Sequence, residues 1–265
     1  MEARGKKVLI RIYRPQIKKF LDAEVEVTKG TTILDILKYV KKNIDGSLAF
    51  RYQCEMGSCG SCGVVVNGKP VLACQTEVLS LKKDKIIIRP LYNFPVIKDL
   101  VVDQEEFMFK KYYKIQPLLK INCEFDELIS PRGEFIIPPK VQEKISVYAR
   151  CINCGLCMAA CPTVSFNDEF LGPYVLLSMY RYYLDPRIGM KELLIEKTVG
   201  NGKGIISCHY IRSCSRVCPE NIEVAECIQK LKKEYFKNVL LITRYEKPEI
   251  NIRKFLSSPT SKILQ

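Results

Sequence analysis

Thirteen cysteines stand out in this chain of 265 residues, which has only one histidine. Four of the cysteines follow the spacing Cys-x4-Cys-x2-Cys, with a fourth further along the chain; they are Cys54, Cys59, Cys62 and Cys74. This spacing is typical of plant-type ferredoxins, in which a [2Fe–2S] cluster needs four thiolates, two on each iron. Glycines between the cysteines permit left-handed turns and close approach of the backbone to the sulfur atoms. The motif therefore predicts a [2Fe–2S] cluster.

A zinc site is the alternative for these four cysteines, because structural zinc sites also use closely spaced cysteine pairs. Zinc sites usually repeat such pairs at a distance, whereas this motif has three clustered cysteines followed by one. The surrounding segment is also expected to be rich in β-strands, with one helix. Both features favour the [2Fe–2S] interpretation.

An internal repeat contains seven more cysteines in two runs of identical register. The first run reads Cys-x2-Cys-x2-Cys-x3-Cys-Pro, and the second repeats it with Ile211 in place of its second cysteine. In two-cluster ferredoxins, the fourth cysteine of each run binds the cluster of the other run. The expected ligands are therefore Cys151, Cys154, Cys157 and Cys218 for a [4Fe–4S] cluster, and Cys161, Cys208 and Cys214 for a second cluster.

The second cluster of the repeat has only three thiolates, because the hydrocarbon side chain of Ile211 cannot bind iron. We therefore expect a [3Fe–4S] cluster, which lacks the unsupported iron. Cys123 or Cys227 is an alternative fourth ligand, but the spacing favours neither, and we expect both to be buried structural cysteines. Two zinc ribbons are a further alternative, against which the strict register of the repeat argues.

An α+β unit is expected over residues 1–102, with the β-grasp fold of plant-type ferredoxins. Alternating or β-branched apolar residues predict strands at Val8–Tyr13, Ala23–Val27, Val64–Val66, Val71–Ala73 and Ile86–Ile88. Apolar residues at helical spacing predict a helix over Ile33–Lys42, capped by Thr31 or Thr32. Asn67-Gly68 between two apolar runs predicts a tight hairpin.

An all-α two-cluster ferredoxin-like unit is expected over residues 103–243, followed by a tail over 244–265. The helical patterns cover Tyr112–Leu119, Val141–Arg150, Tyr174–Leu184, Lys191–Val199 and Ile222–Lys237. Asn221 is expected to cap the last of these helices. Pro173 suits the first turn of the third.

Composition narrows the class of protein further. The chain is 47% hydrophobic and 27% charged, with a formal net charge of +13, which is typical of a globular protein. Lysines and arginines are spread along the chain without a block of five, so we expect a solvated basic surface and no nucleic-acid partner. The N-terminus has no apolar signal region, which favours reduced cytosolic thiols. No window approaches the ~18 apolar residues of a membrane span, so membrane contact requires a partner.

The combination of motifs resembles the iron–sulfur subunit of the succinate dehydrogenase/fumarate reductase family, over most of the chain. The resemblance lies in a plant-type ferredoxin unit followed by a two-cluster unit with isoleucine at the vacant cysteine position. Its most specific segments are residues 51–63 (RYQCEMGSCGSCG), 94–103 (FPVIKDLVVD) and 208–214 (CHYIRSC).

The resemblance implies the role of an electron-transfer subunit. Electrons would pass between FAD in a flavoprotein subunit and a membrane quinone through [2Fe–2S], [4Fe–4S] and [3Fe–4S] clusters. The N-terminal unit would face the flavoprotein, and the three-iron end would face a membrane anchor subunit on the cytoplasmic side of the membrane. His209 and Ile211 would lie near the quinone, and Phe166 would replace a tryptophan that many relatives carry, because this chain has none.

Other functions remain open at the level of sequence. A subunit of a thiol-linked fumarate reductase or of a heterodisulfide-type reductase would use the same clusters, and a basic zinc protein that binds nucleic acid is a third class. The direction of the reaction, succinate oxidation or fumarate reduction, also stays open. No nucleophile elbow and no G-x-G-x-x-G helix start are present. We therefore expect the chain to carry electrons rather than to perform substrate chemistry.

Overall fold

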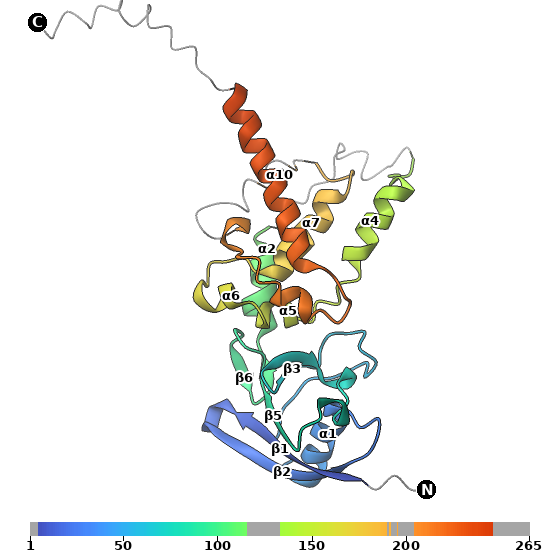
Figure 1. Ribbon diagram of the computed structural model, residues 1–265, viewed down its shortest axis with the longest axis vertical. Helices are drawn as coiled ribbons and strands as arrows, with labels where there is room; N and C mark the ends of the chain where they lie inside the picture. Colours follow the sequence, from blue (N-terminus) through green and yellow to red (C-terminus); the bar gives the residue numbers. More distant parts are fainter. Residues whose placement is uncertain (1–4, 116–132, 190, 192–194, 196–203, 246–265) are drawn as a thin grey trace, which may run out of the picture.

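The chain folds into a sheet domain followed by a helical domain, as expected for an α+β protein (Figure 1). The computed structural model describes residues 5–115, 133–189, 191, 195 and 204–245, with side chains of the last helix up to Lys237. The sheet forms one end of the molecule and the helices lie above it. The last helix, α10 (Val224–Tyr245), projects away from the sheet (Figure 1).

Five strands form the N-terminal sheet in the order β2-β1-β5-β3-β4. They are β1 (Lys6–Arg14), β2 (Lys19–Val27), β3 (Gly63–Val66), β4 (Lys69–Leu72) and β5 (Lys85–Arg89). β1 runs antiparallel to β2 and parallel to β5, and β3 runs antiparallel to both β4 and β5. The five expected strands are confirmed, although the fourth ends one residue earlier than predicted.

Helix α1 (Ile33–Asn43) covers this sheet and begins at a complete capping box. The backbone N–H of Asp35 donates to the Thr32 hydroxyl at 3.2 Å, and the N–H of Thr32 donates to the Asp35 carboxylate at 2.8 Å. These two bonds satisfy N–H groups that have no partner inside the helix. The apolar face of the helix is buried through Ile33, Leu34, Ile36, Leu37 and Val40.

The tight hairpin between β3 and β4 places the fourth cysteine of the first motif. Asn67 and Gly68 both have positive φ, 48° and 87°, as a two-residue type I′ turn requires. Cys74 follows β4 directly, within the short 3-10 helix Ala73–Gln75, and is buried. The predicted hairpin is therefore confirmed.

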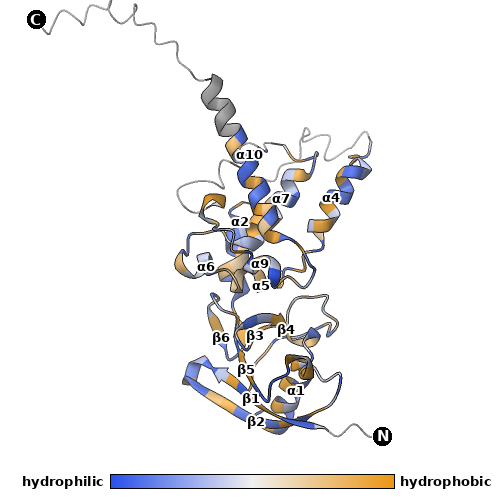
Figure 2. Ribbon diagram, in the orientation of Figure 1, coloured by the Kyte–Doolittle hydropathy of each residue, from blue (hydrophilic) through white to orange (hydrophobic). Residues whose placement is uncertain are grey.

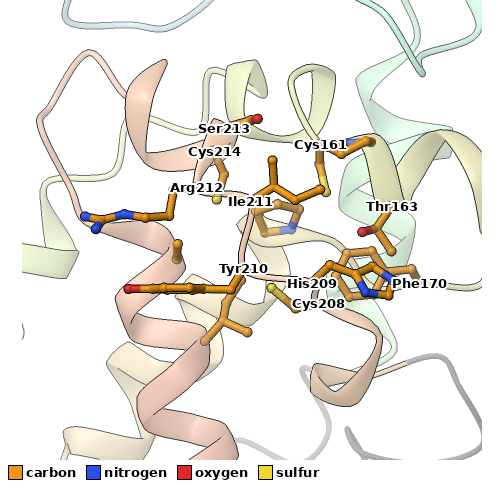
Figure 3. Close-up of a pocket in the computed structure, with 14 residues that line it drawn as sticks. Cys161, Thr163, Phe170, Cys208, His209, Tyr210, Ile211, Arg212, Ser213 and Cys214 are labelled. Atoms are coloured by element: carbon orange, nitrogen blue, oxygen red, sulfur yellow. The ribbon is translucent and has the colours of Figure 1, made fainter.

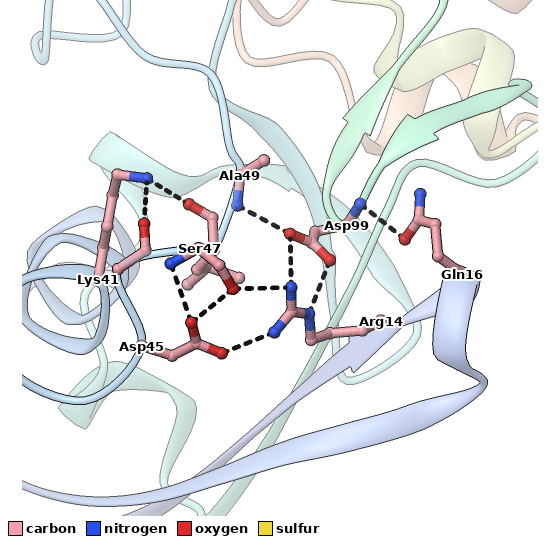
Figure 4. Close-up of polar contacts among 9 residues, drawn as sticks. Arg14, Gln16, Lys41, Asp45, Ser47, Ala49 and Asp99 are labelled. Carbon is pink, nitrogen blue, oxygen red and sulfur yellow. Dashed lines mark hydrogen bonds and ion pairs between the residues drawn. The ribbon is translucent and has the colours of Figure 1, made fainter.

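A buried ion pair fastens the segment that leads from the sheet to the helical domain (Figure 4). Arg14, at the end of β1, donates to the carboxylates of Asp99 at 2.8 Å and of Asp45 at 2.6 Å. Asp99 lies between β6 (Val96–Lys98) and β7 (Val101–Val102), and its side chain is only 2% exposed. Hydrogen bonding to Asp99 raises the pKa of Arg14 above its ordinary value.

We expect Arg14→Met to destabilise the protein by about 3 kcal/mol, because it leaves the Asp99 carboxylate buried without its cation. Arg11→Met is the matched control in the same strand. It breaks an ion pair with Asp22 whose side chains are 29% and 48% exposed, and such pairs contribute at most about 1 kcal/mol. Denaturant unfolding of both variants measures the difference. Equal losses of stability would contradict the structural role of Asp99.

The second domain consists of helices, most of them short. They are a π-helical turn Glu105–Phe109, then α2 (Lys110–Tyr113), α4 (Pro139–Ala149), α5 (Leu156–Ala159), α6 (Pro162–Phe166), α7 (Pro173–Leu184) and α9 (Ser213–Arg216), before α10. The first expected helix, Tyr112–Leu119, is wrong in its bounds: α2 ends at Tyr113, and residues 114–115 form a turn. Its residues 116–119 lie outside the described part. Most of the expected helix Lys191–Val199 also lies outside it.

The predicted cap of the last helix is wrong. Helix α10 begins at Val224, and Asn221 has a left-handed backbone with φ 53°. The chain after Cys218 first turns back toward the sulfur atom, to which the N–H of Ile222 donates at 3.4 Å. The helix can begin only after this turn.

Buried side chains of both domains form one continuous hydrophobic cluster, from Val8 in β1 to Leu231 in α10. In the helical domain, α7 and α10 pack against each other. The coloured part of α10 in Figure 2 has both polar and apolar residues. Within the described residues, no helix combines the length and the hydrophobicity needed to cross a membrane. We propose the domain boundary at residues 102 and 103, where β7 ends.

Candidate metal centres

The four cysteines of the first motif form two close pairs. The sulfur of Cys54 accepts hydrogen bonds from the backbone N–H groups of Ser58 at 3.3 Å and of Cys59 at 3.2 Å. The thiol of Cys62 lies 3.3 Å from the sulfur of Cys74. Two pairs of thiols suit a cluster with two irons and two thiolates on each.

The two halves of this motif differ in electrostatics. The Ser61 hydroxyl, 3.1 Å from the sulfur of Cys59, lowers the pKa of Cys59 to about 6, with help from backbone N–H groups. Burial raises the pKa of Cys62 to about 11. Hydrogen bonds to sulfur favour the thiolate, which is the form that binds iron.

The second group of cysteines lines a cavity between α5, α7 and the start of α10, with an empty volume of about 350 Å³. Its sulfur-bearing residues are Cys151, Cys154, Cys157 and Cys218. Cys218 belongs to the second run of the repeat. It is the equivalent there of Cys161, which lies 57 positions earlier. Cys218 therefore lines the same cavity as three cysteines of the first run, the arrangement that an exchange of fourth cysteines would require.

The third group lines a separate cavity of similar size, about 340 Å³. Cys161 comes from the first run, and Cys208 and Cys214 come from the second (Figure 3). Ile211 lies among these three side chains, and Phe170 and His209 also line the cavity (Figure 3). Three thiols line this site, and Ile211 stands where the repeat would place the fourth.

The backbone of the repeat has the same conformation at equivalent positions. Asn153 and Tyr210 have φ of 56° and 57°, and Gly155 and Arg212 have φ of 74° and 64°. Helices α5 and α9 then begin at equivalent residues, one after Gly155 and the other after Arg212. Ile211 consequently occupies the backbone position that Cys154 occupies in the first run.

Burial favours the protonated form of the thiols in the second and third sites when no cation is bound. It raises the pKa of Cys154 and of Cys214 to about 12, and neighbouring thiols contribute in the same direction. Burial also raises the pKa of Cys157 well above its ordinary value. A bound cation reverses this preference, because a coordinating thiol loses its proton. Buried, clustered thiols around a cavity fit iron–sulfur clusters.

Two of the three residues that are predicted to lie near the quinone line the same cavity. His209 and Ile211 line the third cavity, whereas Phe166 is not among the residues that line it. Phe166 ends α6 and is 87% exposed. Sequence reasoning missed Phe170 in the third cavity and Tyr174 in the second, because neither belongs to a motif.

Burial was predicted for both cysteines outside the motifs, and the structure describes one of them. Cys227 is fully buried in α10, and its thiol donates to the carbonyl of Glu223 at 3.3 Å, which confirms its expected burial. Cys123 lies outside the described residues.

Asn93 connects the first domain to the turn that carries a cysteine of the third site. Its side-chain amide donates to the carbonyls of Met158, Ala159 and Cys161 at 2.9, 3.3 and 3.2 Å. Its amide oxygen accepts from the Ser165 hydroxyl at 2.6 Å. One side chain thereby fastens the end of α5 and the start of α6 to the linker.

Fold and sites together define an iron–sulfur protein with a ferredoxin-type sheet domain and a dicluster domain. Residues 8–109 match the family model of a 2Fe-2S iron-sulfur cluster binding domain, and residues 148–222 match that of a 4Fe-4S dicluster domain. Each match contains the corresponding cysteine motif. The [2Fe–2S] and two-cluster character of the domains is thereby confirmed.

Comparisons with whole proteins identify the family. The chain is 37% identical over 224 residues to the fumarate reductase iron-sulfur subunit of Mycobacterium tuberculosis, covering 83% of this chain and 88% of the relative. It is 32% identical over 222 residues to the succinate dehydrogenase iron-sulfur subunit of Coxiella burnetii, covering 83% and 90%. A chain of the Mycobacterium smegmatis Sdh1 complex in the apo form matches with a TM-score of 0.78 and 25% identity, covering 88% of this chain and 97% of that chain. The protein belongs to the family of iron–sulfur subunits of fumarate reductase and succinate dehydrogenase.

We expect Cys59→Ser to damage the [2Fe–2S] cluster and to leave the two other clusters assembled, because all four cysteines of the first motif lie in the sheet domain. Cys227→Ala is the matched control, since it removes a buried cysteine outside every motif. EPR spectra of the reduced and oxidised variants report the three clusters separately. Simultaneous loss of all three signals in Cys59→Ser alone would contradict independent assembly of the two domains.

Proposed function

We propose that this chain is the electron-transfer subunit of a succinate:quinone oxidoreductase or a quinol:fumarate reductase. It relays electrons between FAD in a flavoprotein subunit and a membrane quinone. The observation that carries this proposal is the pair of cavities lined by cysteines from both runs, with Ile211 in place of one thiol. The names of relatives from both kinds of complex support the same role.

Eleven cysteines hold the three clusters in this proposal. Cys54, Cys59, Cys62 and Cys74 bind [2Fe–2S]; Cys151, Cys154, Cys157 and Cys218 bind [4Fe–4S]; Cys161, Cys208 and Cys214 bind [3Fe–4S]. The two thiol pairs of the first motif and the two cavities support this division.

Each cluster, when bound, accepts and releases one electron at a time. The protein contributes thiolate ligands, backbone N–H groups directed at sulfur, and burial of the second and third sites. Hydrogen bonds and solvent exposure are what tune the potentials of such clusters. The partly exposed Cys54 and Cys59 leave the first site near the surface, which suits electron exchange with a partner.

The partners follow from this role. The sheet domain faces the flavoprotein, and the end of the molecule that carries His209 and Ile211 faces the quinone and a membrane anchor subunit. We place the protein on the cytoplasmic side of the membrane, attached through that anchor. Ile211, which lines the third cavity, is exposed, and so are the apolar side chains of Phe166 and Ile206 in the same domain, which supports this orientation. Phe166 lies at the edge of the quinone site in this proposal.

Purification of the tagged chain from its native membranes tests the proposal. We expect a flavoprotein to co-purify, and we expect the complex to show succinate-dependent quinone reduction or quinol-dependent fumarate reduction. A cluster-loaded complex that reduces a disulfide or oxidises thiols, with no activity towards quinones, would instead favour the thiol-linked alternative.

A further inference from the structure

Gly60 lies between Cys59 and Cys62 of the first site and is buried against the cysteine loop of the second site. A Cβ atom at this position would lie 2.6 Å from the carbonyl oxygen of Ile152 and 2.9 Å from the Cα of Cys154. Cβ atoms essentially never come within 3.0 Å of such atoms, and both contacts are with rigid backbone. Only glycine fits here without separating the two loops.

A second glycine extends the same contact. A Cβ atom on Gly63 would lie 3.4 Å from the carbonyl oxygen of Cys154 and 3.1 Å from the side chain of Leu91. The loop of the first site thus meets the loop of the second backbone to backbone. No side chain stands between Gly60 and Cys154.

We propose that Gly60 is a positioning residue that sets the distance between the first and second clusters and thereby the rate of electron transfer between them. This inference rests on the proposed function, because it requires both clusters to lie in one electron path. Electron tunnelling slows steeply as the distance between centres grows, and a gap in space slows it more than the same length of covalent bonds. The path from Cys59 through Gly60 to Cys154 crosses a single van der Waals contact.

Gly68→Ala is the control for Gly60→Ala, because it introduces similar backbone strain without a contact between the two loops. Gly60 has φ 72° and Gly68 has φ 87°, so alanine is strained at both. Gly68 has no atom within 4 Å of the added Cβ, and it lies in the hairpin turn between β3 and β4, outside the loop that carries Cys54, Cys59 and Cys62. Only Gly60→Ala therefore wedges the two loops apart.

The measurement uses the full-length chain loaded with its clusters and fully reduced by dithionite. A nearby paramagnetic [4Fe–4S] cluster speeds the relaxation of the [2Fe–2S] signal, so the microwave power at half-saturation reports their separation. We expect a clear decrease of this power in Gly60→Ala and no change in Gly68→Ala. In the intact complex, electrons from the flavoprotein should reach the third cluster severalfold more slowly in Gly60→Ala, as measured by rapid freeze-quench EPR.

Equal half-saturation powers in Gly60→Ala, Gly68→Ala and the wild type would overturn the inference. If Gly60→Ala does not assemble its clusters, Gly63→Val decides, because Gly63 does not have a left-handed backbone. Its added Cβ already reaches contact distance, 3.4 Å, from the Cys154 carbonyl oxygen, so the two further methyl groups of valine press the loops apart. A decrease of the power in Gly63→Val supports the inference, and an unchanged power overturns it. Absence of either cluster from the wild type would count against the proposed function itself, which keeps the two failures distinguishable.

Discussion

Cys218→Ala is expected to abolish the [4Fe–4S] cluster and to leave the three-thiolate cluster in place, although Cys218 belongs to the second run. Its sulfur lines the cavity of Cys151, Cys154 and Cys157. Loss of one thiolate from a buried site removes both a ligand and the charge that balances the iron. EPR of the reduced protein measures the [4Fe–4S] cluster, and EPR of the oxidised protein measures the three-iron cluster.

Cys161→Ala is the reciprocal variant. Cys161 belongs to the first run, yet it lines the cavity of Cys208 and Cys214, so its replacement should remove the three-iron signal and spare the [4Fe–4S] cluster. If each replacement instead destroys the cluster of its own run, the exchange of ligands between the runs is wrong.

Ile211→Cys is expected to convert the [3Fe–4S] cluster to a [4Fe–4S] cluster. Ile211 shares its backbone environment with Cys154, because the flanking residues of both runs have matching left-handed φ angles. A cysteine at position 211 would therefore have the same local backbone as Cys154, which lines the second cavity. Ile211 is 51% exposed, so its replacement should cost little stability. The variant should lose the EPR signal of the oxidised three-iron cluster.

The same variant should slow electron delivery to quinone. A four-iron cluster of this kind usually has a lower potential than a three-iron cluster, and about 59 mV corresponds to a tenfold change in a one-electron equilibrium. Ile211→Val is the matched control, because it stays β-branched and offers no ligand; it should keep the three-iron signal. A three-iron signal of full intensity in Ile211→Cys would show that position 211 does not face the vacant corner.

Motif spacing was sufficient to predict which cysteines line each of the two cavities. The cysteines within a run are a few residues apart, and the register of the repeat indicated the two distant ones, Cys161 and Cys218. The helix cap, predicted at Thr31 or Thr32, and the turn at Asn67-Gly68 were predictable because each depends on neighbouring residues. Both are fixed by side-chain and backbone chemistry within one turn of chain.

Long-range contacts were not predictable from spacing. The Asp99 ion pair joins residues 85 positions apart, and the amide of Asn93 reaches carbonyls more than 60 positions away. The cap prediction at Asn221 failed because the chain there turns toward the sulfur of Cys218 before α10 begins. In the first two cases a neighbour distant in sequence decides the local structure, and at Asn221 the decisive neighbour is a nearby sulfur atom that helix-capping patterns do not take into account.

EPR spectroscopy of the purified wild-type protein, handled without oxygen and measured in the oxidised and reduced states, tests the central claim of a three-cluster electron carrier most directly. The oxidised protein should show one three-iron signal. That signal should disappear on reduction as the signals of the [2Fe–2S] and [4Fe–4S] clusters appear. An oxidised protein without any three-iron signal, whose helical domain holds two diamagnetic four-iron clusters, would contradict the assignment of Ile211 as a position without a ligand.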